Sequence, residues 1–228
     1  FTGESAILDR PVAVHAHYMA ACNAFYAPTD RGLHFGDSDD DFNCGGFAAD
    51  SAEDADVVIH EYGHAIQDDQ VPGWGEAAPP SNEQARAMGE GFGDFIAAAM
   101  SGDPCIGEYV SFGFSECAGA PGLRYLQNTM DYPAGFESCP DMDYGEEEHC
   151  GGLLWGGALW DLVEALSGGS GDPVTQDARD TALRLVLESH FFIDQVATFD
   201  QAAAAICLAD ELLYGGAHEV TIGTVFLN

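Results

Sequence analysis

A pentapeptide in the first third of the chain carries the side chains best suited to chemistry: His60-Glu61-Tyr62-Gly63-His64. On a helix, two histidines four residues apart leave from one face, so both imidazoles can meet one metal ion. Glu61 lies one step round the helix, where it can reach a water molecule beside that ion. This is the H-E-x-x-H spacing of zinc hydrolases, in which the glutamate is the general base. The plainer alternative is a buried, purely structural histidine pair.

The flanking residues predict the helix that must present this pentapeptide. Ser51 is a favourable N-cap residue, and the acidic residues after it suit the positive end of a helix dipole. Pro72 ends the predicted helix. Apolar residues recur at helical spacing between these two points, at Ala55, Val58, Ile59, Tyr62, Ala65 and Ile66.

A second predicted helix, 81–100, supplies the third ligand that a catalytic zinc requires. Ser81 and Gln84 have the spacing of a capping box. The helix contains three alternate glycines, each costing about 1 kcal/mol against alanine, so the sequence indicates close approach to another helix. Glu90 is the candidate third ligand. Asp94 projects from the same face, where it can accept a hydrogen bond from a ligand histidine.

At this point the chain resembles a known family. Segments 56–64 (DVVIHEYGH) and 88–95 (MGEGFGDF) look like those of the fungalysins, secreted metallopeptidases within the wider thermolysin-like gluzincin group. The resemblance extends over most of the chain. It implies one catalytic zinc, with roles for five residues: the ligands His60, His64 and Glu90, the base Glu61, and Asp94 as hydrogen-bond partner of a ligand.

The resemblance also implies an α+β fold of two lobes within a single catalytic domain, 1–228. Residues 1–50 form a small β-rich lobe that carries a substrate edge strand, and residues 51–228 form a mainly helical lobe with the zinc helices. The chain begins at Phe1 without a signal peptide, so we expect a processed product.

The N-terminal part predicts a strand over Val12–Tyr18 and a hairpin over Asn23–Phe35 at a sheet edge. In thermolysin-like enzymes a similar edge strand binds extended substrate by β-augmentation. The match implies that role for the backbone of Asn23 and Ala24, with Tyr26 nearby; the alternative is an ordinary hairpin. The histidines of this region are interpreted as strand residues rather than ligands, namely His15, His17 and His34.

Three further residues acquire roles only through the resemblance. Arg124 contacts substrate carbonyl groups, or alternatively pairs with surface acids. Val57 lines a primed-side pocket. His149, expected in a glycine-flanked turn before a helix, donates a hydrogen bond to the oxyanion of the tetrahedral intermediate. The acid that orients it is left open among four candidates, Asp143, Glu146, Glu147 and Glu148. Thermolysin also uses a tyrosine donor between its second histidine ligand and its glutamate ligand, and this chain has no tyrosine there.

The net charge limits the classes of partner that this protein can bind. The 228 residues include 39 Asp and Glu against 6 Arg and Lys, a formal net charge of −33. Such a surface repels nucleic acid and anionic membranes, and no apolar run reaches transmembrane length. We therefore expect a secreted protein, and a monomer. The resemblance implies polypeptides as its substrates and an inhibitory propeptide as a candidate partner. The acidic run 37–41 is a candidate Ca²⁺ loop, with solvated carboxylates as an equal alternative.

Seven cysteines, several in Gly- and Pro-rich loops, indicate disulfides and an oxidising compartment. We predict the pairs Cys105–Cys117 and Cys139–Cys150, less securely Cys22–Cys44, and a free Cys207.

The sequence as a whole predicts a secreted zinc endopeptidase in which Glu61 activates a metal-bound water. Two alternatives are kept. A gluzincin aminopeptidase would share the ligands but usually carries an upstream acidic anchor for the free amine of its substrate. Here the upstream strand, 23–26, reads Asn-Ala-Phe-Tyr, which favours internal cleavage. A non-catalytic secreted zinc-binding module would need neither Glu61 nor His149.

Overall fold

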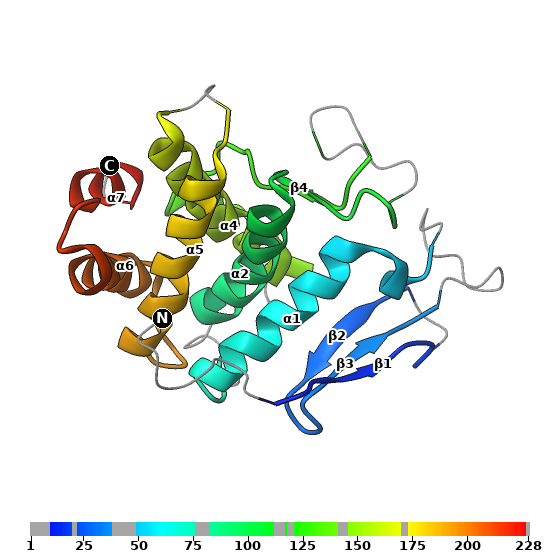
Figure 1. Ribbon diagram of the computed structural model, residues 1–228. Helices are drawn as coiled ribbons and strands as arrows, with labels where there is room; N and C mark the ends of the chain where they lie inside the picture. Colours follow the sequence, from blue (N-terminus) through cyan, green and yellow to red (C-terminus); the bar gives the residue numbers. More distant parts are fainter. Residues whose placement is uncertain are drawn as a thin grey trace.

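The computed structural model describes residues 10–19, 22–37, 49–75, 83–111, 117, 121–140, 146–169 and 173–226. Within these residues a small sheet lies along one side of the first long helix, and further helices lie on its other side (Figure 1). The strands are β1 Ala13–His15, β2 Ala24–Ala27, β3 Gly32–Phe35, β4 Cys105–Ile106 and β5 Arg124–Tyr125. The α-helices are α1 Ala55–Gln70, α2 Glu83–Ser101, α3 Ala134–Glu137, α4 Glu146–Ser167, α5 Gln176–Ser189, α6 Phe199–Tyr214 and α7 Glu219–Phe226, with 3₁₀ turns at Ser51–Glu53 and His190–Phe192.

The N-terminal sheet has the order β1-β3-β2, which leaves β2 at an edge. The predicted hairpin is confirmed, because β2 and β3 pair antiparallel from Ala24 opposite Phe35. β1 runs parallel to β3 and is shorter than the predicted strand Val12–Tyr18. The reason is His17, whose φ of 56° lies in the left-handed region and ends the extended backbone.

The start of α1 differs from the sequence prediction. Asp54, not Ser51, is the N-cap residue, and its side chain accepts a hydrogen bond from the backbone N–H of Asp56 at 2.9 Å. The Ser51 hydroxyl instead lies 3.0 Å from the carbonyl oxygen of Asn23 and 2.9 Å from that of Gly36. Ser51 therefore joins the start of the helical region to the sheet. Its hydroxyl donates to carbonyl oxygens of Asn23 and Gly36 instead of accepting from backbone amides of the helix.

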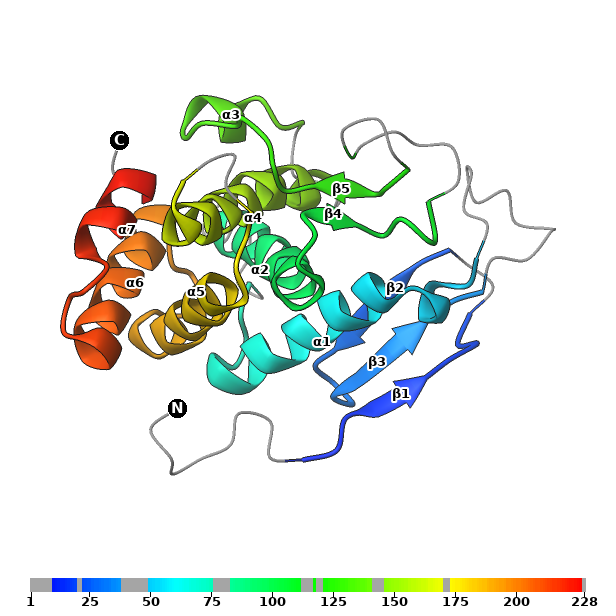
Figure 2. The same ribbon diagram turned by 45° about the horizontal axis from the view of Figure 1, so that its top comes forward.

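Helix α2 lies between α1 and α4, as the two views together show (Figures 1 and 2). Two of its glycines permit this. A Cβ on Gly91 would lie 2.6 Å from the carbonyl oxygen of Gly152 in α4, and a Cβ on Gly93 would lie 2.7 Å from Nδ1 of His60 in α1. The close helix approach predicted from these glycines is confirmed. The Ser81–Gln84 capping box falls on Ser81, outside the described residues.

Helix α4 begins at Glu146, so His149 lies within its first turn and not in a turn before it. The backbone continues as helix there because three consecutive glutamates, 146–148, suit the positive end of the helix dipole. The apolar face of α4 is buried in the core, chiefly Trp155, Leu159, Trp160, Leu162 and Val163.

The predicted disulfides Cys105–Cys117 and Cys139–Cys150 are confirmed, and Cys207 is free and half-buried. Cys22 is disulfide-bonded, while its predicted partner Cys44 lies outside the described residues. Helix α5 ends at Ser189 and continues directly into the 3₁₀ turn His190–Phe192, and Gly215, at a φ of 63°, closes α6. Within the described ranges, none of the helices has the length and apolar character needed to cross a membrane.

Candidate metal centre

Helices α1 and α2 bring His60, His64 and Glu90 together at the bottom of a cleft. One ligand atom from each lies within 4.8 Å of the other two. The Nε2 atoms of the two histidines are 3.1 Å apart. Glu90 Oε2 lies 3.2 Å from Nε2 of His60, and Glu90 Oε1 lies 3.6 Å from Nε2 of His64.

These three separations fit a metal ion. Tetrahedral zinc with bonds of about 2.0–2.1 Å places its ligand atoms about 3.3 Å from one another. The observed values, 3.1, 3.2 and 3.6 Å, scatter around that figure. Two imidazoles and a carboxylate are also the donor set of a catalytic zinc site with a fourth position for water. The arrangement of the side chains present therefore suits zinc.

Asp94 fixes the orientation of the first histidine. Its Oδ1 lies 2.8 Å from Nδ1 of His60. A carboxylate only accepts, so Nδ1 of His60 donates to Asp94, and Nε2 is the ring atom that faces Glu90. Arg124 holds Asp94 in turn, through Nε to Oδ2 at 2.6 Å and a terminal nitrogen to Oδ1 at 2.7 Å.

The charges around Asp94 and His60 favour the ionised form of both groups, so they lower the pKa of Asp94 and raise that of His60. Burial alone would raise the pKa of Asp94, but the charge of Arg124 and the His60 hydrogen bond hold it well below its ordinary value. Burial alone would lower the pKa of His60, yet Asp94 and Glu90 raise it to about 10. Without a metal, His60 therefore holds a proton at neutral pH, and an ion that binds its Nε2 must displace that proton.

Glu61 and His149 face the same space. The Glu61 side chain is buried, and among the described residues its Oε2 has no hydrogen-bond partner. Nε2 of His149 lies 3.0 Å from Oε2 of Glu90, and its side chain is 44% exposed. Of the four acids considered as its orienting partner, Glu148 instead forms an ion pair with Arg86. Asp143 and the side chains of Glu146 and Glu147 lie outside the description.

The cleft above these residues has a volume of about 350 Å³ and opens beside a smaller hollow of about 160 Å³. Both are lined by Asn23 and Ala24 at the start of β2, together with His60, Glu61 and His149. The edge strand therefore forms one wall of the cleft.

Residues 41–228 match the sequence model of the fungalysin metallopeptidase family (M36). The chain belongs to this family. A fungalysin is a metallopeptidase by definition, so the family implies a metal, and the three clustered side chains are the candidates to hold it.

Curated relatives carry the same description. Extracellular metalloproteinase 3 of Arthroderma otae is 31% identical over 192 residues, which cover 78% of this chain and 30% of that protein. Extracellular metalloproteinase 3 of Trichophyton soudanense is 30% identical, with coverage of 78% and 48%. This fungalysin chain thus spans less than half the length of either relative.

A solved structure shares the fold. The precursor of protealysin, a metalloproteinase from Serratia proteamaculans, superposes with a TM-score of 0.66 at 17% sequence identity, covering 90% of this chain and 64% of that one. The predicted thermolysin-like architecture, a small N-terminal sheet followed by a mainly helical region, is confirmed.

The remaining predicted residues divide between the two hollows. Val57 and Arg124 line the smaller one, although the Arg124 side chain is only 18% exposed and is bound to Asp94. Tyr26 lines the larger one and donates its hydroxyl to Oδ2 of Asp68 at 2.8 Å, which ties β2 to α1. Burial, together with Asp68, raises the pKa of Tyr26 to about 12.

Sequence reasoning missed Trp74. It lines the larger hollow, and its Nε1–H donates to the carbonyl oxygen of Ala85 at 2.6 Å, so this N–H is already engaged. A signal existed: this large aromatic residue lies between two glycines, Gly73 and Gly75, shortly after the predicted helix that carries His60 and His64.

Proposed function

We propose that this fungalysin is a zinc-dependent, extracellular endopeptidase that acts on polypeptides. The observation that supports this best is that one cleft contains both a three-atom ligand set and the buried side chain of Glu61, whose Oε2 has no hydrogen-bond partner among the described residues. A structural zinc site has no use for a spare carboxylate beside its ligands. The names of the relatives and the disulfides, among them Cys105–Cys117 and Cys139–Cys150, agree with export.

In this proposal His60, His64 and Glu90 hold one zinc ion. When bound, zinc polarises the scissile carbonyl group and lowers the pKa of a water molecule. Glu61 accepts the proton of the attacking water and passes it to the leaving amine. His149 donates a hydrogen bond to the carbonyl oxygen as negative charge develops on it.

The edge strand orients the substrate. Because β2 lies at the end of the sheet and its first residues border both hollows, an extended peptide can pair with the backbone of Asn23 and Ala24. Val57 and Arg124 then border the hollow that receives the neighbouring substrate residue. The sheet and the helices act together as one catalytic domain.

Replacement of Glu61 by Gln tests the proposal. The amide cannot accept a proton, so turnover of an internally quenched peptide with both ends blocked should fall at least about a hundredfold. Bound zinc, measured by elemental analysis, should stay at one equivalent. Glu53→Gln is the matched control, because Glu53 is exposed in the 3₁₀ turn before α1 and its loss removes the same charge.

Two results would count against the assigned roles: retained turnover in Glu61→Gln, or loss of its zinc. The blocked substrate also separates the alternatives. If the unmodified chain cleaves only peptides with a free amino terminus, it is an aminopeptidase.

A further inference from the structure

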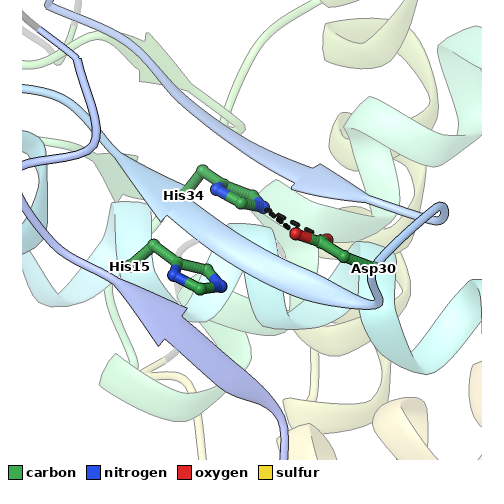
Figure 3. Close-up of side chains that lie close together, drawn as sticks. All are labelled: His15, Asp30 and His34. Atoms are coloured by element: carbon green, nitrogen blue, oxygen red, sulfur yellow. Dashed lines mark hydrogen bonds and ion pairs between the residues drawn. The ribbon is translucent and has the colours of Figure 1, made fainter.

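The N-terminal sheet carries a second group of side chains of the types that ligate metals, on strands and a turn that precede α1 and α2 in the sequence. His15 lies in β1, His34 in β3, and Asp30 in the turn between β2 and β3. Figure 3 shows the two rings side by side on adjacent strands, with the carboxylate beyond the end of the His34 ring. From the sequence pattern we had interpreted His15 and His34 as strand residues and not as metal ligands.

Strand pairing places the histidines opposite each other. β1 and β3 pair with His15 directly across from His34, and their rings stack at a centroid separation of 4.6 Å and an interplanar angle of 11°. Asp30 approaches the same edge of the inner ring: its carboxylate oxygens lie 3.1 and 3.2 Å from Nε2 of His34. One donor atom from each of the three residues lies within 4.8 Å of the other two.

Gly32 keeps space open between these donors. A Cβ on Gly32 would lie 3.2 Å from Asp30 Oδ1 and equally 3.2 Å from Nε2 of His15. These two donor atoms therefore border one small volume, in which glycine leaves room that any other residue would fill. Nε2 of His34 contacts the same carboxylate from the neighbouring position on β3.

We propose that His15, Asp30 and His34 form a second site for a divalent transition-metal ion of the zinc class. Two imidazoles and one carboxylate suit zinc, whereas calcium and magnesium take oxygen ligands. His15 is exposed, so its ring can turn to bring Nε2 closer, and Asp30 is half-exposed. The His34 ring is held in place by two aromatic neighbours. Phe25 stacks on it at a centroid separation of 4.8 Å, and Tyr18 lies edge-on at a centroid separation of 4.2 Å.

An ion in this position would link β1 to the β2–β3 turn. The linked sheet carries β2, the strand that borders the cleft. The site lies on the opposite face of β3 from Leu33 and Phe35, which pack in the core with residues of α1. Its occupancy should therefore stabilise the sheet without entering the cleft.

Equilibrium dialysis against zinc, with excess calcium to occupy oxygen-only sites, tests the proposal. The unmodified chain should bind two equivalents of zinc. His15→Phe keeps an aromatic ring on His34 but removes both nitrogens, and it should bind one equivalent. Asp30→Asn should weaken the second equivalent at least about tenfold. The second equivalent should raise the melting temperature of the unmodified chain but not that of His15→Phe.

His17→Ala is the matched control. His17 lies two residues further on, is exposed, and bonds to Asp37 rather than Asp30. It belongs to another group with Asp37 and Asp50, so it distinguishes the two locations. The proposal is overturned if the unmodified chain binds one equivalent only, if His15→Phe retains two, or if His17→Ala alone loses the second. Because His64→Ala leaves the outer site intact, that variant should still bind one equivalent, whatever the fate of the proposed peptidase activity.

Discussion

His149 shows how one side chain can serve two neighbouring groups. Its Nε2 lies 3.0 Å from a Glu90 oxygen, while nearly half of the side chain is open to the cleft. The ring can therefore support the Glu90 carboxylate, and in the proposed mechanism it also meets a substrate carbonyl oxygen. These two roles differ in what is lost when the ring is removed.

We predict that His149→Ala lowers kcat about a hundredfold or more and leaves KM and bound zinc nearly unchanged. A donor aimed at developing oxyanion charge is worth about 3 kcal/mol in the transition state. Steady-state kinetics and elemental analysis at matched pH measure the two effects. Because Cys150 is disulfide-bonded, the variant must first be shown to retain that bond.

The opposite pattern would identify a positioning residue. If zinc affinity falls in His149→Ala while the turnover of the zinc-saturated protein is preserved, the histidine acts through Glu90 and not on the substrate.

At the scale of elements, the site depends on how closely α2 fits between its neighbours. The Gly91 backbone faces Gly152 and Gly156 of α4, and Gly93 faces the His60 ring of α1. Both helices would have to move apart to admit side chains here, and His60 would move away from Glu90. The glycines thus lower the helix propensity of α2 but allow the close packing that sets Glu90 beside His60.

Gly91→Ala should destabilise the fold by about 1–3 kcal/mol, although alanine is the better helix former. The new methyl group would meet backbone atoms, which cannot rotate away. Gly223→Ala in α7 is the matched control: a Cβ added there would meet no heavy atom within 4 Å, so the same change should be neutral or stabilising by up to about 1 kcal/mol. Urea unfolding of both variants measures the difference. Equal effects at the two positions would show that packing against α4 is looser than the backbone distances indicate.

At the scale of the whole molecule, charge is the dominant imbalance. Only 6 basic side chains accompany 39 acidic ones. Some of the former are already engaged inside the structure: Arg124 with Asp94, Arg86 with Glu148, and Arg179 with the carbonyl oxygen of Ala99. The remaining carboxylates repel one another across the surface and oppose the compact state.

The melting temperature should therefore rise with sodium chloride at fixed zinc and calcium. Most of the rise should come below about 1 M, because the Debye length falls from about 30 Å at 0.01 M to about 3 Å at 1 M. Sucrose, which stabilises folded proteins without screening charge, serves as the comparison. A melting temperature that stays constant or falls as sodium chloride is added would show that repulsion between carboxylates does not limit the stability of the fold.

The sequence by itself determined the features that depend on local periodicity. The four-residue spacing of His60 and His64 places both rings on one helical face, and the same spacing relates Glu90 to Asp94. Turn residues located the β2–β3 hairpin. In each case residues close together in the chain fix the local geometry, so the sequence pattern is enough to predict that geometry.

Only the tertiary structure decided which distant groups satisfy one another. Ser51 looked like a helix cap, but the carbonyl groups of Asn23 and Gly36 take its hydroxyl. Arg124 looked like a substrate contact, and it is bound to the buried Asp94. His15 and His34 are nineteen residues apart, and the parallel pairing of β1 with β3 sets their rings together. Such contacts depend on how the elements pack against one another, and residue spacing along the chain does not predict that packing.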